Sequence, residues 1–197
     1  MSKYNPKIHH RRSIRLKGYE YSQTGAYFVT LVTHQRKMLF GEVVSGEMRL
    51  NALGEIAEKW WYDIPIHFPN VKTGAFVVMP NHIHGIIIIE TECRGAVPAS
   101  GNDVKHIIEN QGEMTSENQG EMTSPLRKPT LGQIVAYYKY QSTKEMNLLD
   151  GSGVITKFWQ RNYHDRIIRD ECEMERIWRY IESNPDNWKD DREFSDQ

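Results

Sequence analysis

TGAFVVMPNHIHGIIIIE, residues 73–90, is the stretch that decides the fold. Both of its halves are rich in aromatic and β-branched residues, which favour strands, and Pro80-Asn81 separates them. The sequence therefore predicts one strand over residues 73–79 and another over 84–90, with His82-Ile83-His84 opening the second. Because residues two apart in a strand point the same way, both imidazoles are expected on one side and Ile83 on the other.

The sequence before this pair of strands predicts a strand, a hairpin and a helix. AYFVTLVTH at 26–34 has strand composition. Residues 39–44 and 48–50 form a predicted hairpin around the three-residue loop Ser45-Gly46-Glu47. Asn51 is the predicted N-cap of a helix that ends near residue 64, because Pro65 follows.

Two further helices are predicted near the end of the chain. The pattern Thr130-x-x-Gln133 indicates a capping box for a helix that reaches about residue 146. Residues 158–168 are expected to be extended, and a last helix begins at Asp170 and ends before Pro185. Its expected buried residues are Met174, Ile177, Trp178 and Ile181. This order of elements predicts an α+β fold whose antiparallel sheet has helices packed on one face.

Composition divides the chain into one domain and three polar segments. The predicted domain covers residues 21–188, and a basic arm covers 1–20. A low-complexity insertion at 91–129 contains ENQGEMTS twice, at 109–116 and 117–124, and an acidic tail covers 189–197. The repeat is polar and lacks aromatic residues, so we expect a solvated loop there.

Bulk properties exclude several protein classes. The net charge is −1, but the arm concentrates Lys and Arg without acidic residues over positions 5–17, and such local patches attract polyanions. The two cysteines cannot build a disulfide framework or a zinc module, which fits a reducing cytoplasm. The sequence predicts no signal peptide and no contact with a membrane, so the expected localisation is cytoplasmic.

Four residues have side chains suited to phosphate chemistry. His82 and His84 form a two-point metal clamp, although a pair of surface or hydrogen-bonded histidines at a strand start has the same sequence. A histidine-triad phosphohydrolase is excluded, because residue 86 is Ile. Tyr180 and Asn184 lie one helical turn apart; the alternative interpretation is a tyrosine covering the core edge and an asparagine ending the helix.

Three motifs together carry a family resemblance. They are VMPNHIHGI at 78–86, WQRNYHDRIIR at 159–169 and YIESNP at 180–185. They resemble the single-tyrosine (HUH) transposases of the insertion-sequence type, and within that family the REP-associated tyrosine transposases (RAYT). The resemblance extends over about residues 11–188.

The resemblance implies a ferredoxin-like domain that acts in DNA transposition. Such a domain is expected to nick single-stranded or hairpin DNA and to join ends through a tyrosine–DNA intermediate. It implies that Tyr180 is the nucleophile and that His82, His84 and Asn184 hold Mg²⁺ or Mn²⁺. The oligomeric state stays open between a monomer and a homodimer.

Several alternatives accompany this assignment. Tyr137 and Tyr140 are rival nucleophiles, since insertion-sequence relatives carry theirs on a helix after the histidine motif. A hairpin-binding protein without cleavage activity and a metal-dependent phosphohydrolase of small substrates are the rival functions. The residues expected to contact DNA are Arg11, Arg12, Arg15, Lys17, Arg161, Tyr163, Arg166 and Arg169.

Overall fold

The computed structural model describes residues 22–90, 129–151 and 153–190. The predicted basic arm, nearly all of the insertion with its ENQGEMTS repeat, and most of the acidic tail lie outside the described residues. The elements are β1 Gly25–Val32, η1 His34–Arg36, β2 Gly41–Val44, β3 Glu47–Leu50, α1 Ala52–His67, β4 Val71–Met79, β5 His82–Ile89, α2 Leu131–Asp150, β6 His164–Ile168, α3 Glu171–Glu182 and η2 Trp188–Asp190.

Four strands form one antiparallel sheet in the order β4-β5-β1-β6. Taken along the chain, β1, α1, β4, β5, α2 and β6 give the βαββαβ order of a ferredoxin-like fold. The hairpin of β2 and β3 is a separate small sheet inserted after β1. The predicted α+β class with an antiparallel sheet is therefore confirmed.

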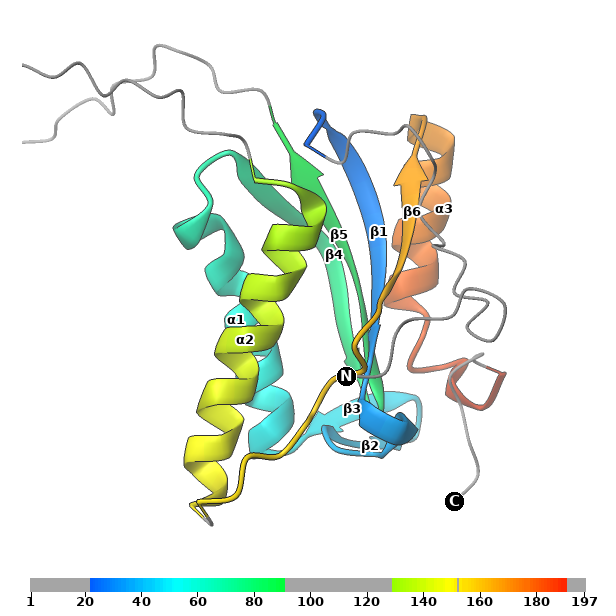
Figure 1. The fold of residues 1–197 in the computed structure, drawn as a ribbon. Helices are drawn as coiled ribbons and strands as arrows, with labels where there is room; N and C mark the ends of the chain where they lie inside the picture. Colours follow the sequence, from blue (N-terminus) through cyan, green and yellow to red (C-terminus); the bar gives the residue numbers. More distant parts are fainter. Residues whose placement is uncertain (1–21, 91–128, 152, 191–197) are drawn as a thin grey trace, which may run out of the picture.

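The two faces of the sheet carry different layers (Figure 1). On β5, Ile83, Ile87 and Ile89 belong to the larger core with α1 and α2, whereas Ile86 and Ile88 belong to a smaller cluster with α3. This split follows from the two-residue period of a strand. The expected packing of helices on one face holds for α1 and α2, while α3 lies on the other.

The side chains predicted to cap the helices accept hydrogen bonds from backbone N–H groups at the helix starts. Asn51 accepts hydrogen bonds from Leu53 and Gly54 N–H groups at the start of α1. Thr130 and Gln133 form the predicted capping box of α2, and Asp170 caps α3. These caps fix where each helix enters the fold.

The structure corrects three local predictions. The β2–β3 loop has two residues, Ser45 and Gly46, because Val44 pairs with Glu47; their φ angles of 55° and 82° suit a tight hairpin turn. Pro65 lies inside α1 and does not end it. Because α1 continues only to His67, the lost N–H donor and the crowding by the proline ring disturb the last turns alone. Trp178 is 40% exposed and not buried, with its indole N–H donating to Glu182.

Across the described residues, no helix combines the length and the apolar character needed to cross a bilayer.

Candidate active site

The histidine pair lies at the start of β5 and faces α3. His82 pairs with Val32, and His84 pairs with Thr30, which itself pairs with His164 on β6. Both imidazoles point to the same face, as the strand alternation predicted, and both are buried. Their ring centroids are 4.4 Å apart. The pair is therefore a packed feature of the α3 face and not a surface pair.

Hydrogen bonds orient both rings. Nδ1 of His82 lies 2.8 Å from the amide oxygen of Asn81, whose amide nitrogen donates to the carbonyl of Arg36. Because that oxygen only accepts, Nδ1 of His82 carries the proton, and in the neutral imidazole Nε2 then keeps a lone pair. In His84, Nδ1 lies 2.9 Å from the hydroxyl of Thr30. Outer partners of this kind orient metal-binding histidines in proteins.

Helix α3 brings Tyr180 to His84. The phenol oxygen of Tyr180 lies 3.1 Å from Nε2 of His84, and when Nδ1 donates to Thr30, Nε2 accepts this hydroxyl hydrogen. Ile177 and Ile181 pack α3 onto the sheet and so hold the tyrosine on this side. Tyr180 is 41% exposed, so its hydroxyl is both anchored and accessible.

These side chains surround an open pocket of about 680 Å³. The described residues that line it are Phe28, Thr30, Arg36, His84, His164, Asp165, Arg166, Tyr180, Ser183, Asn184, Asn187 and Asp190. Asn184 is only 2% exposed, one turn beyond Tyr180. His82 does not line the pocket; its ring lies behind, against His84 and near Trp188, with a centroid distance of 5.8 Å to the latter. The structure thus brings His84, Tyr180 and Asn184 to one cavity and seats His82 beneath it.

The donor atoms here suit a divalent cation. Imidazole nitrogen and amide oxygen are both metal ligands, and the structure buries Nε2 of His82 and Oδ1 of Asn184 on this face of the sheet. The part of the chain that the structure describes contains no group of three or more His, Cys, Asp or Glu side chains arranged for a metal. A third donor to a metal beside the two histidines would therefore have to come from a side chain of another type, such as the amide of Asn184.

The rival tyrosines lie across the sheet from the histidines. The Tyr137 hydroxyl donates to Asp63 of α1 at 2.8 Å, and its ring stacks on His67. Burial, then the hydrogen bond to Asp63, raises the pKa of Tyr137 to about 12. Tyr140 is 66% exposed on the same helix. Neither lines the pocket.

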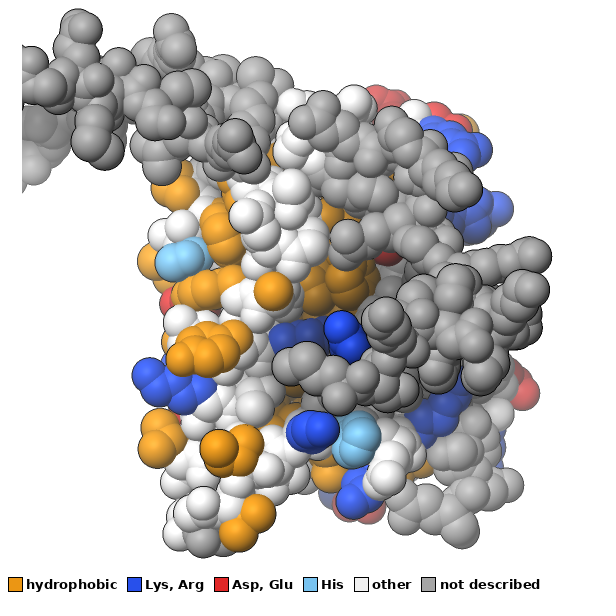
Figure 2. Space-filling view, viewed as in Figure 1, with side chains coloured by type: hydrophobic (Ala, Val, Ile, Leu, Met, Phe, Trp, Pro, Cys, Tyr) orange, Lys and Arg blue, Asp and Glu red, His pale blue; other side chains and the backbone are white. Residues whose placement is uncertain are grey.

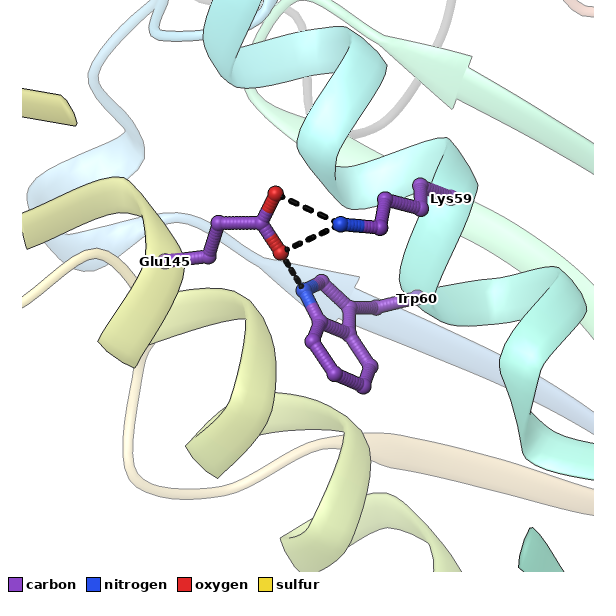
Figure 3. Close-up of polar contacts among 3 residues, drawn as sticks. All are labelled: Lys59, Trp60 and Glu145. Atoms are coloured by element: carbon purple, nitrogen blue, oxygen red, sulfur yellow. Dashed lines mark hydrogen bonds and ion pairs between the residues drawn. The ribbon is translucent and has the colours of Figure 1, made fainter. Parts of the chain in front are cut away.

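The outer face of α1 and α2 is built differently from the pocket. Glu145 of α2 accepts hydrogen bonds from Lys59 and from the indole of Trp60, both on α1, and so joins the two helices (Figure 3). Apolar side chains also gather over α1 and α2 on the face shown in Figure 2. Leu148 and Leu149 of α2 are exposed.

The residues predicted to contact DNA separate into three groups. Arg166 lines the pocket and forms an ion pair with Glu173 at 2.6 Å. The Arg169 backbone N–H, followed by the Arg166 guanidinium, holds the pKa of Glu173 below its usual value. Arg161, Tyr163 and Arg169 are not among the lining residues. Arg11, Arg12, Arg15 and Lys17 lie outside the described residues.

Lys139 of α2 contacts the segment 160–163, which includes Tyr163. The ammonium of Lys139 donates to the carbonyls of Gln160 and Asn162, both at 2.9 Å, and lies 5.7 Å from the centre of the Tyr163 ring. Burial lowers the pKa of Lys139 to about 8. This contact holds the segment that leads into β6, and thereby the edge of the pocket that Arg166 occupies.

Thr30, Arg36, Asn81 and His164 are among the residues in and around the pocket that the sequence interpretation missed. Thr30 and His164 join His84 only through strand pairing, which local patterns do not specify. Asn81 precedes His82 directly, and that adjacency was an available signal. Arg36 follows a predicted strand end and had no distinguishing pattern.

Comparisons with known proteins agree with this architecture. An uncharacterized protein of Haemophilus influenzae is 38% identical to the chain over 195 residues, which cover 99% of each protein. The two proteins belong to one family. No family model matches the chain. A solved structure of a REP-associated tyrosine transposase bound to a REP hairpin superposes with a TM-score of 0.53 and 16% identity, covering 90% of this chain and 74% of that one. At this identity, the likeness concerns the fold.

Proposed function

We propose that this protein is a transposase that nicks single-stranded DNA and rejoins it through a covalent phosphotyrosine at Tyr180. The observation that carries the proposal is the 3.1 Å contact between the Tyr180 hydroxyl and His84 Nε2, in an open pocket that Asn184 and Arg166 also line. The fold shared with a REP-associated tyrosine transposase supports it, and since that protein was bound to a REP hairpin, hairpin or single-stranded DNA is the proposed substrate.

The proposed reaction is a phosphodiester exchange. The phenol oxygen of Tyr180 attacks phosphorus, a new P–O bond to the tyrosine forms, and the P–O3′ bond of the DNA breaks. The phenolic proton leaves to water in the open pocket, and the departing 3′ oxygen takes up a proton. Because one phosphodiester replaces another, a 3′-hydroxyl can later reverse the step on a new strand without ATP.

The proposed metal ligands are His82, His84 and Asn184. All three side chains are neutral, so a bound Mg²⁺ or Mn²⁺ would keep its full charge to offset that of a non-bridging phosphate oxygen. The Asn81 contact supports this assignment, because it leaves a lone pair on His82 Nε2. Nicking that requires Zn²⁺ and fails with both Mg²⁺ and Mn²⁺ would contradict the choice of ion.

The decisive experiment is a covalent-adduct assay. A labelled hairpin oligonucleotide from the flanks of the gene is incubated with the protein and Mn²⁺, then resolved on a denaturing gel. We expect an adduct with the wild type and with the matched variants Tyr137→Phe and Tyr140→Phe, and none with Tyr180→Phe. An adduct that persists in Tyr180→Phe refutes the assignment of the nucleophile.

The same assay separates the alternatives. A hairpin-binding protein without cleavage activity would retain the hairpin in a native gel and form no adduct with any metal. A phosphohydrolase of small substrates would turn over nucleotides without a covalent species. The arm residues, Arg161, Tyr163, Arg166 and Arg169 are the proposed DNA contacts, and a homodimer stays a prediction of the resemblance.

A further inference from the structure

Arg36 enters the pocket from a turn with an unusual backbone. In η1, Gln35 and Arg36 have φ angles of 59° and 57°, the left-handed region that L residues other than glycine rarely adopt. Two such residues in succession require support from their surroundings. Non-glycine residues held in this region concentrate at functional sites.

Two buried polar side chains hold this turn. Thr33 donates from its hydroxyl to the carbonyl of Lys37 at 2.8 Å and accepts at its own carbonyl from the backbone N–H of Arg36 at 3.1 Å. The amide nitrogen of Asn81 donates to the carbonyl of Arg36 at 3.4 Å, while the Asn81 carbonyl accepts from Thr33 N–H at 2.9 Å. Thr33 and Asn81 are both completely buried. The turn is therefore clamped to the loop that precedes β5.

The clamp links Arg36 to the histidine pair. The same Asn81 side chain bonds the Arg36 carbonyl with its nitrogen and His82 Nδ1 with its oxygen. Pairing of Val32 with His82 sets the turn beside the start of β5. One amide thus orients both the imidazole and the backbone that carries the guanidinium.

Among the described residues, Arg36 and Arg166 are the two arginines that line the pocket. Arg166 extends from β6 and forms an ion pair with the Glu173 carboxylate at 2.6 Å. Arg36 comes from η1, whose backbone is bonded to Asn81 next to His82, and it is exposed and lines the cavity. A guanidinium offers two parallel N–H donors to a phosphate and so fixes its orientation as well as its charge.

We propose that Arg36 binds the phosphodiester that Tyr180 attacks, with Asn81 as a positioning residue that sets the turn. This inference rests on the proposed function. Arg36 donates N–H hydrogen bonds to a non-bridging oxygen and stabilises the charge that develops there as the Tyr180–phosphorus bond forms; no bond to Arg36 is made or broken.

The test compares Arg36→Gln and Arg36→Lys with the matched control Arg179→Gln. Arg179 is an exposed arginine of α3 that pairs with Glu175 and does not line this pocket. Glutamine suits the backbone, because Gln35 has nearly the same φ. Circular dichroism melts check that the variants fold.

Two quantities are measured on a labelled hairpin oligonucleotide. In single-turnover adduct formation, we expect Arg36→Gln to slow the rate about 100-fold, the typical loss when one transition-state donor is removed. In equilibrium binding, measured in a Tyr180→Phe background, we expect the slope of log affinity against log salt to fall by about 0.7 for the lost phosphate contact. Arg36→Lys should restore the salt slope but only part of the rate, and Arg179→Gln should change neither quantity.

The outcomes separate the two proposals. A wild type that forms no adduct under any metal refutes the proposed function. If Arg36→Gln forms the adduct as fast as the wild type, Arg36 does not act on the attacked phosphate, whatever the salt slope. This result refutes the role of Arg36 and leaves the proposed function standing. Asn81→Ser extends the test through the salt slope in the Tyr180→Phe background, because its adduct rate also depends on the His82 contact. A lower slope that adding Arg36→Gln does not reduce further supports positioning by Asn81, and additive reductions of the slope contradict it.

Discussion

The two faces of the central sheet use the same strands for different purposes. The face toward α1 and α2 is a continuous apolar core, in which Trp61 stacks on Phe76 with ring centroids 4.6 Å apart. The face toward α3 has a small apolar cluster, and beside it lie His82, His84 and Asn184, all buried and polar. Neighbouring residues of β5 therefore face the large apolar core and the pocket side of the sheet in alternation.

This contrast teaches how a small domain holds a polar site. Burying polar groups costs free energy, and the loss is offset where each group has a hydrogen bond or a ligand. The large core on one face stabilises the sheet, so the opposite face can keep an open pocket. We expect substitutions on the two faces to separate stability from activity.

The largest effect is expected on the α3 face, in activity alone. Tyr180→Phe removes the proposed nucleophile and should abolish the covalent DNA adduct. Its stability should change by about 1 kcal/mol or less, because one partly exposed hydrogen bond to His84 is lost. Urea unfolding and the adduct assay on the same preparation test this, and a large loss of stability would show that the tyrosine is mainly structural.

On the other face, Trp61→Ala should act mainly on stability. Trp61 is completely buried between Phe76 and Tyr138. Removing such a side chain costs about 3–5 kcal/mol. Chemical denaturation measures the loss. Hairpin binding at low temperature, where the variant remains folded, should be retained; loss of binding in folded protein would contradict the division between faces.

A smaller effect is expected at Gly85, where one substitution should affect both faces of the sheet. A Cβ added to Gly85 would lie 2.2 Å from the Trp61 ring, so Gly85→Ala overpacks the core directly beside His84. Overpacking costs about 1–3 kcal/mol. We expect a lower melting temperature together with a slower adduct rate. An unchanged melting temperature would mean that Trp61 shifts without cost.

The pH dependence of stability should reveal the contribution of Tyr137, whose side chain lies between α1 and α2. Burial, together with the hydrogen bond to Asp63, raises the pKa of Tyr137 in the folded state to about 12, above the usual value of about 10. The neutral phenol is therefore favoured by folding, so its contribution is fully present below about pH 10 and is lost as pH rises toward about 12. Urea midpoints across this window should fall less in Tyr137→Phe than in the wild type. Equal slopes in both proteins would refute this contribution.

The smallest effect is expected at the surface contact between α1 and α2. Glu145→Gln removes the charge that pairs with Lys59 at 2.7 Å, and the side chains are partly exposed. Such pairs contribute about 0.2–1 kcal/mol. The hydrogen bond from Lys59 lowers the pKa of Glu145, so this contribution should disappear as pH falls through the folded pKa. Denaturation at neutral and acidic pH tests both statements.

Much of the fold follows from local patterns in the sequence. Strand alternation put His82 and His84 on one side of β5. The caps at Asn51, Thr130 and Asp170 marked where three helices begin. Such signals act over one turn of helix or two residues of strand, so they can be predicted from the sequence alone. The helix ends were less predictable, since Pro65 is accommodated within α1.

The assembly of the site depended on the tertiary structure. Tyr180 and His84 are 96 residues apart, and their contact exists because α3 packs on the face opposite α1 and α2. Thr30, His164 and Arg36 reach the pocket through strand register and a clamped turn. By itself, the sequence determined the elements, the faces of the strands and the candidate chemical groups. Only the tertiary structure decided which of those groups meet, because register and the side on which a helix packs depend on contacts between segments distant in the chain.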